Sequence, residues 1–286
     1  MNKFILLFSL VALFPLNLFA VNKVIGGTKT SNLEHPWQLS LQVRFSGHLC
    51  GASLVRKNVV LTAAHCVKSF SPSTLRLKGM SSTGEVDRLK RLPRIKSIHM
   101  HPEFDPDKIV AHDIAVIILK RDVQLNDYLG VIDIPSLEDN VIIESDFRNM
   151  AGRFASTGWG SKEAPSNFPI YSKDLMEVDV RAVGVTKTDL QDEGFREQMI
   201  REFNMDDELL NFIQLNRSNV LLTTGVVAET GNCIGDSGGP LVYYEKDRRA
   251  KLVGITSYAV GGTVLCKGLA GFTNIQAYSK WLSQYL

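Results

Sequence analysis

The chain has 286 residues, 32 basic and 30 acidic, and its formal charge is +2 at neutral pH. This balance leaves no strongly basic character, so we expect no nucleic acid and no membrane as a partner. The length allows a substantial core in one large or two small domains, and four cysteines without a CxxC pair favour two disulfides over a zinc site.

The N-terminus has the pattern of a secretory leader. Met1–Lys3 is a short positive start, residues 4–19 are almost wholly apolar, and Ala20 is a small closing residue. We expect residues 1–20 to be a signal peptide. A membrane anchor is the alternative, but the apolar run is short for a span of about 20 residues and no basic cluster follows it. The protein is therefore expected to be secreted, or periplasmic if its source is bacterial.

The following residues resemble a processing site, because Lys23 precedes a small apolar residue and two glycines in Val24–Gly27 (VIGG). On this segment alone, a flexible N-terminus is the simpler interpretation.

The next hundred residues have the pattern of short β-strands. Residues 39–45 (LSLQVRF) alternate between apolar and polar, and residues 59–61 (VVL) form a strongly apolar run. Further strands are expected at residues 75–77, 94–99 and 114–119, separated by Gly, Pro and Asp. The first half of the chain is therefore predicted to be all-β.

Two polar residues follow or precede these strands. His65 ends the segment Leu61–Cys66 (LTAAHC), and a bridge between Cys50 and Cys66 would close a loop of about 16 residues, worth about 3 kcal/mol, and would hold His65 in place. Asp113 stands where a loop enters an apolar strand, a boundary at which a carboxylate needs a hydrogen-bond partner. A simple cap or turn residue is the alternative interpretation.

The second half continues with strands expected at residues 155–160, 175–180, 219–222, 240–244, 252–257 and 271–275. Between them, residues 188–215 are rich in helix formers, with Phe195, Met199 and Phe203 recurring every four residues among many acids. We predict one or two amphipathic helices here, with a solvated acidic outer face as the simpler interpretation and an exosite or lid as the alternative. Apolar residues at helical spacing also predict a packing helix over residues 276–286.

Three histidines, His99, His101 and His112, raise the question of a metal site. No carboxylate or cysteine is evidently spaced to complete one, so they are interpreted as surface and loop histidines.

The most informative stretch is Gly231–Pro240 (GNCIGDSGGP). Its glycines permit a tight turn that exposes the hydroxyl of Ser237 and directs backbone N–H groups toward one point. An ordinary polar loop is the alternative, unless the chain also supplies a base and an orienting acid.

Taken together, these segments resemble the trypsin-like, chymotrypsin-fold (S1) family of secreted serine endopeptidases over residues 24–286. The resemblance is carried by six motifs in the family's order: VIGG at Val24–Gly27, LTAAHC at Leu61–Cys66, HDIAVIIL at His112–Leu119, TGWG at Thr157–Gly160, GDSGGP at Gly235–Pro240 and ITSY at Ile255–Tyr258. It implies an all-β fold of two six-stranded antiparallel β-barrels, at about residues 24–130 and 131–275, with the active site in the cleft between them. A C-terminal helix follows at about 276–286, and the helical insertion lies in the second barrel.

The resemblance also implies the roles of the catalytic residues. Ser237 would attack the peptide carbonyl, His65 would transfer the proton, and Asp113, supported by Ser257, would orient the imidazole. The backbone N–H groups of Gly235 and Ser237 would form the oxyanion hole. The family's disulfides would correspond to Cys50 with Cys66 and Cys233 with Cys266.

Activation follows from the same resemblance. Residues 21–23 would be an activation propeptide, and cleavage after Lys23 by a trypsin-like protease would free the Val24 amine to pair with Asp236. A charge pair buried in this way fails if either partner is missing.

The specificity pocket departs from that of trypsin itself, because Gly231 stands where trypsins carry an aspartate at the pocket base. A cationic side chain would be desolvated there without a counter-charge. We expect a neutral pocket that takes aliphatic or modest aromatic substrate side chains. If Lys267 points into the pocket, an acidic substrate side chain would be favoured instead. The pocket residues implied are Gly231, Asn232, Ser257, Tyr258, Ala259, Ala270 and Gly271.

The expected partners are protein or peptide substrates, the activating protease and protein inhibitors, with the enzyme a monomer that needs no cofactor and no metal. The main alternative is a catalytically silent protease-fold binding protein, whose usual mark is a replaced triad residue. An α/β-type esterase is disfavoured because its triad runs in a different order along the chain.

Overall fold

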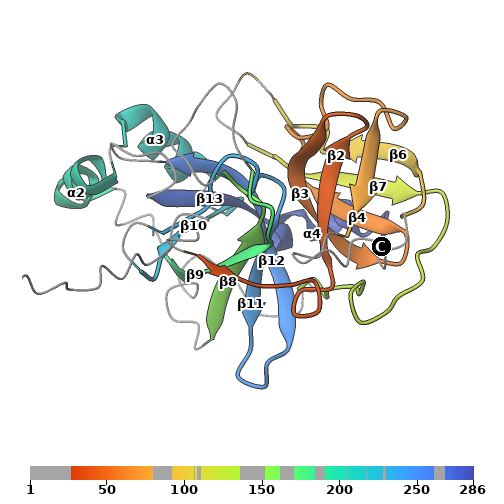
Figure 1. The fold of residues 1–286 in the computed structure, drawn as a ribbon. Coiled ribbons are helices and arrows are strands. Elements are labelled where there is room, and N and C mark those ends of the chain that lie inside the picture. The colour runs from red at the N-terminus through yellow and green to blue at the C-terminus, as the bar shows by residue number, and fades with distance from the viewer. Residues whose placement is uncertain are drawn as a thin grey trace, which may run out of the picture.

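We describe the fold from a computed structural model of the chain (Figure 1). The structure describes residues 27–79, 92–105, 107, 111–135, 152–161, 171–183, 191–203, 205–216, 218–227, 230–260 and 268–286. The predicted signal peptide, the propeptide and Val24 lie outside the described residues, as do Lys267 and Cys266.

Six strands of the first half form one antiparallel sheet. They are β2 (Gln38–Val43), β3 (Gly47–Arg56), β4 (Val59–Thr62), β5 (Leu75–Lys78), β6 (Ile95–Met100) and β7 (Ala115–Leu119). Their order in the sheet is β5-β2-β3-β4-β7-β6. The sheet is curled around a core that includes Leu39, Leu54 and Ile117.

The second half forms a closed barrel. Its strands are β8 (Arg153–Gly158), β9 (Met176–Ala182), β10 (Val220–Gly225), β11 (Pro240–Tyr244), β12 (Ala250–Val260) and β13 (Leu269–Asn274). A short strand β1 (Thr28–Lys29) forms an antiparallel pair with β9. Pairing between β8 and β9 closes the ring. The all-β, two-barrel expectation is confirmed, with the refinement that only the second sheet closes on itself among the described strands.

Of the strands that the structure describes in the first sheet, β3 is the one that the sequence pattern did not predict. Its ten residues include two glycines and a serine, which weaken the expected alternation. Gly51 explains part of this composition, because a Cβ there would lie 2.6 Å from Cα of Gly239 in the second half. Glycine is therefore required where the two halves touch.

The helical insertion is α2 (Glu193–Phe203) and α3 (Asp207–Asn216), connecting β9 to β10 at the outer edge of the second barrel (Figure 1). Met199, Leu210 and Ile213 are buried against the strand residues Val220, Leu222 and Leu269. The insertion therefore has a core of its own that rests on β10 and β13.

The chain ends in a 3-10 turn η3 (Ile275–Tyr278) and a short helix α4 (Ser279–Leu282). The predicted C-terminal helix thus begins as expected but ends at Leu282 rather than Leu286. Ile275, Tyr278 and Leu282 pack in the core of the first sheet. Since this segment follows directly from β13 of the second barrel, it connects the two halves of the molecule. Among the described residues, no helix is long and apolar enough to cross a membrane.

Candidate active site

His65 and Asp113 meet at the inner edge of the first sheet, where β4 ends and β7 begins. Nδ1 of His65 lies 2.7 Å from Oδ2 of Asp113, and the backbone N–H of His65 donates to Oδ1 at 2.8 Å. The Asp113 side chain is fully buried. A buried carboxylate with both oxygens occupied in this way holds the imidazole with its proton on Nδ1 and leaves Nε2 as an acceptor.

Two residues of the second barrel complete the surroundings of Asp113. The Ser257 hydroxyl donates to Oδ2 at 2.6 Å, as expected, and the Thr273 hydroxyl donates to the Asp113 carbonyl at 2.9 Å. Thr273 carries no motif that would have singled it out from the sequence. Since Ser257 and Thr273 come from β12 and β13, Asp113 is hydrogen-bonded by residues from both halves of the molecule.

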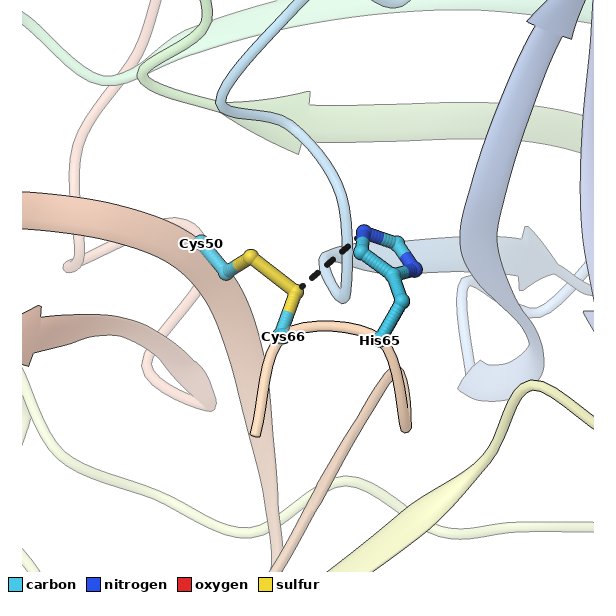
Figure 2. Close-up of side chains that lie close together, drawn as sticks. All are labelled: Cys50, His65 and Cys66. Atoms are coloured by element: carbon cyan, nitrogen blue, oxygen red, sulfur yellow. Dashed lines mark hydrogen bonds between the residues drawn. A yellow bond between two sulfur atoms is a disulfide. The ribbon is translucent and has the colours of Figure 1, made fainter. Parts of the chain in front are cut away.

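The predicted bridge between Cys50 and Cys66 is present and lies beside His65 (Figure 2). Nε2 of His65 is 3.6 Å from Sγ of Cys66. Neither disulfide sulfur carries a proton, so this contact leaves the Nε2 lone pair able to accept one. Among the described residues, no hydrogen bond joins this ring nitrogen to Ser237. Cys233 is also disulfide-bonded, and its expected partner, Cys266, lies outside the described part of the chain.

The turn that carries Ser237 is held by its own backbone. The N–H groups of Asp236, Gly238 and Gly239 donate to the carbonyls of Cys233, Thr256 and Asp236 at 2.7 to 2.9 Å. Gly235 and Gly238 have φ values of 98° and 76°, a region that only glycine adopts readily. The Ser237 carbonyl accepts from the Gly51 N–H at 2.7 Å, which ties the turn to β3.

Within this turn, the N–H groups of Gly235 and Ser237 have no acceptor among the described residues, unlike those of Asp236, Gly238 and Gly239. Two unused donors on one tight turn are what a developing oxyanion needs.

Asp236 is buried beneath the turn. Its carboxylate accepts from the Gly160 N–H and the Cys233 N–H, each at 2.8 Å. A Cβ on Gly160 would lie 2.2 Å from a carboxylate oxygen, so this glycine makes room for the acid. Burial raises the pKa of Asp236 to about 6 in spite of the two hydrogen bonds.

His48 is a residue of the site that sequence reasoning missed. Its Nε2 lies 2.8 Å from the Gly235 carbonyl, and its Nδ1 lies 2.8 Å from the Ser40 hydroxyl. The ring contacts Trp159 and Tyr171 edge-on, and burial lowers its pKa. His48 sits on β3, the strand that was not predicted, so no local signal pointed to it.

The predicted pocket residues have different surroundings. Gly231, Asn232, Ser257 and Ala270 are buried, whereas Ala259 is exposed. Nδ2 of Asn232 donates to the Ser156 hydroxyl at 2.6 Å, and its Oδ1 has no partner within the described ranges of the chain. Gly231 has no side chain, so the position where trypsins carry an aspartate holds no charge.

Tyr258 differs most from the other pocket residues. Its ring covers Gly271 on the paired strand so closely that a Cβ there would lie 2.2 Å from it, and it lies 6.5 Å from the ring of Phe212 on α3. Its hydroxyl is buried and has no partner in the part of the chain that the structure describes, and burial raises its pKa above the usual range. Tyr258 therefore links the pocket strand β12 to the helical insertion.

Comparison with known proteins agrees with this arrangement. The family model described as Trypsin matches residues 24–282. The chain is 27% identical over 270 residues to "Atrial natriuretic peptide-converting enzyme" of Mus musculus, covering 92% of this chain but only 21% of that protein. It is 29% identical over 275 residues to "Fibrinolytic enzyme, isozyme C" of Lumbricus rubellus, covering 91% of this chain and 98% of the other. With a family match across most of its length, the chain belongs to the trypsin family of serine endopeptidases.

Proposed function

We propose that this protein is a secreted serine endopeptidase, made as a zymogen, that hydrolyses peptide bonds through an acyl-enzyme. The observation that carries the proposal is the buried Asp113 carboxylate bonded to Nδ1 and the backbone N–H of His65 and to Ser257. Burying a carboxylate costs desolvation free energy, and here its hydrogen bonds hold His65 in one imidazole tautomer. A general base needs such a fixed tautomer, because Nε2 must be free to take a proton.

In the proposed reaction, Nε2 of His65 takes the proton of Ser237 as its hydroxyl oxygen attacks the substrate carbonyl. The imidazolium that forms is stabilised by Asp113 and then gives its proton to the leaving amine. The free N–H groups of Gly235 and Ser237 donate hydrogen bonds to the oxyanion of the tetrahedral intermediate, where loss of one donor typically costs about 3 kcal/mol.

Activation by cleavage after Lys23 is supported by the burial of the Asp236 carboxylate. A carboxylate that is fully buried and has no cationic partner among the described residues is poorly stabilised as an anion. Insertion of a free Val24 amine would supply the missing positive charge. Full turnover by a purified form that still carries residues 21–23 would contradict this part of the proposal.

The pocket is proposed to be neutral and to take aliphatic or modest aromatic side chains. Gly231 and Ala270 are buried and uncharged, so a cationic side chain would lose its hydration without compensation. A peptide library scan of the activated enzyme measures the preference, and Gly231→Asp is the matched variant, because it adds only a carboxylate. We expect cleavage after Arg or Lys to become prominent only in Gly231→Asp.

A pocket that rejects lysine would not cleave the Lys23–Val24 bond, so we propose that a separate trypsin-like protease activates the zymogen. Incubation of the pure zymogen alone, followed by N-terminal sequencing, tests this. A Val24 terminus that appears without added protease counts against it. Protein inhibitors and protein substrates are the partners proposed for the monomeric enzyme.

Labelling with a fluorophosphonate probe separates an active protease from a silent binding protein. We expect the activated wild type to be labelled, the Ser237→Ala variant to remain unlabelled, and the unactivated zymogen to react far more slowly. An activated wild type that stays unlabelled while correctly folded would favour the binding protein.

A further inference from the structure

We infer that His101, Glu103 and His112 form a binding site for a divalent transition metal ion of the zinc class. Each side chain offers one ligand atom, and the three atoms lie within 4.8 Å of one another. His101 and Glu103 lie two residues apart in the sequence, and the fold brings His112 beside them.

The distance between two of the ligand atoms fits a tetrahedral ion. Nε2 of His112 is 3.6 Å from Oε2 of Glu103, close to the edge of about 3.4 Å of a tetrahedron with bonds of about 2.1 Å. The two imidazole rings are stacked, with centroids 5.1 Å apart and planes 12° apart. Two imidazoles and one carboxylate are ligands that suit zinc, and three protein ligands leave a fourth position for water.

The rings are held in place before any ion arrives. The backbone N–H of His101 donates to the Ile114 carbonyl at 3.0 Å, and its ring meets Tyr278 and Trp281 edge-on at 5.1 and 5.0 Å. His112 adopts a φ of 55°, which directs it out of the strand that follows. A site with two ordered ligands loses little side-chain entropy on binding.

An outer contact supports His112 as a ligand. Its Nδ1 lies 3.2 Å from the hydroxyl oxygen of Tyr278. With the proton on Nδ1 donated to that oxygen, Nε2 keeps its lone pair on the side of Glu103, the arrangement that ligating histidines commonly have. The Glu103 side chain is 71% exposed, so it can adjust to the ion and leaves the site open to solvent.

An ion that binds only the folded state stabilises that state, and the rings of His101 and His112 that would hold it already contact Tyr278 of the C-terminal segment. The expected effect is therefore a more stable folded state. This inference does not depend on the proposed catalytic roles, and its experiment measures binding rather than turnover.

Calorimetric titration of the full chain with Zn²⁺ tests the site, together with thermal unfolding in Zn²⁺ and in a chelator. We expect one ion per chain and a higher Tm with zinc. Glu103→Gln and His101→Gln should each weaken binding at least about tenfold, and Tyr278→Phe, which removes only a hydroxyl, by about 10- to 100-fold. His99→Gln is the matched control, because His99 bonds to Ser97 and lies beside Tyr285, and it should bind like the wild type.

Two results would overturn the assignment. One is the absence of both a saturable heat and a zinc-dependent Tm shift in the folded wild type. The other is undiminished binding in Glu103→Gln and His101→Gln, which would place the ion elsewhere, for instance at His65. A Co²⁺ complex with the strong visible absorption of a tetrahedral site, lost in Glu103→Gln, would support it.

Discussion

Asp113 accepts four of the hydrogen bonds of the candidate site. Its side chain and carbonyl receive bonds from His65, Ser257 and Thr273, which lie on three different segments. Its function in the proposed mechanism depends on accepting at both carboxylate oxygens.

The variant Asp113→Asn tests this function. An amide can accept at only one of the two positions and would favour the other imidazole tautomer, so we expect kcat/KM to fall by about 10⁴-fold with the fold retained. Steady-state kinetics on the activated enzyme, with circular dichroism as the check on folding, measures the effect. Ser257→Ala is the milder comparison, and a larger loss there than in Asp113→Asn would contradict the assigned order.

Asp236 makes a prediction about pH. Its folded-state pKa is raised from 3.8 to about 6, so the folded state binds its proton more tightly than the unfolded state. The stabilisation is fully present below pH 4 and is lost as the pH rises through 6, by about 3 kcal/mol in all.

Denaturant unfolding of the zymogen at pH 4 and pH 7.5 measures this change against Asp236→Asn, which cannot titrate. The difference in unfolding free energy between variant and wild type should shift by about 3 kcal/mol in favour of the variant as the pH rises. In the activated enzyme, the Val24 amine would remove most of this shift. An equal shift in both forms would argue against the proposed ion pair.

At the scale of elements, the helical insertion is a packed part of the second barrel. Leu210 of α3 is fully buried in a cluster with Met199 and Ile213, whereas Leu215, on the same helix, is 84% exposed. The insertion also reaches Tyr258 on β12 through Phe212. Its apolar face and the strands β10 and β13 were predicted from the sequence, but the packing of that face on those strands was not.

Leu210→Ala and Leu215→Ala form a matched pair on one helix. Removal of the buried side chain leaves a cavity and should cost 2 to 5 kcal/mol, roughly, while the exposed position should change stability by less than about 0.5 kcal/mol. Urea unfolding measures both. Equal midpoints for the two variants would mean that α3 unfolds separately from the barrel.

At the scale of the whole molecule, the two halves touch where β3 passes the Ser237 turn. Gly51 donates to the Ser237 carbonyl, and its missing side chain leaves room for Gly239. The position of Ser237 relative to His65 thus depends on a contact between backbones.

Gly51→Ala should separate the halves locally, since its Cβ would meet backbone atoms at 2.6 and 2.8 Å. We expect a loss of about 1 to 3 kcal/mol in stability and slower fluorophosphonate labelling of Ser237. Gly47→Asn on the same strand is the control, because a Cβ there meets nothing within 4 Å and asparagine tolerates a positive φ. Equal labelling rates in the two variants would refute the contact's role.

The sequence by itself determined the all-β class, most strands, the helical insertion and one disulfide. These features are local. A strand is predicted from the period of its apolar residues, and a motif such as GDSGGP is recognised from closely spaced residues. His65, Asp113 and Ser237 were found because each stands inside such a motif, and the structure then brings the first two together.

Only the tertiary structure decided the contacts between distant segments. His48 beside Gly235, Thr273 on Asp113, Tyr258 against α3 and His112 beside His101 and Glu103 are contacts between residues that share no period or spacing. Strand β3 was missed for a related reason, since Gly51 serves a close approach to the other half rather than the strand itself. Such pairings follow from how the two sheets pack, which no single segment encodes.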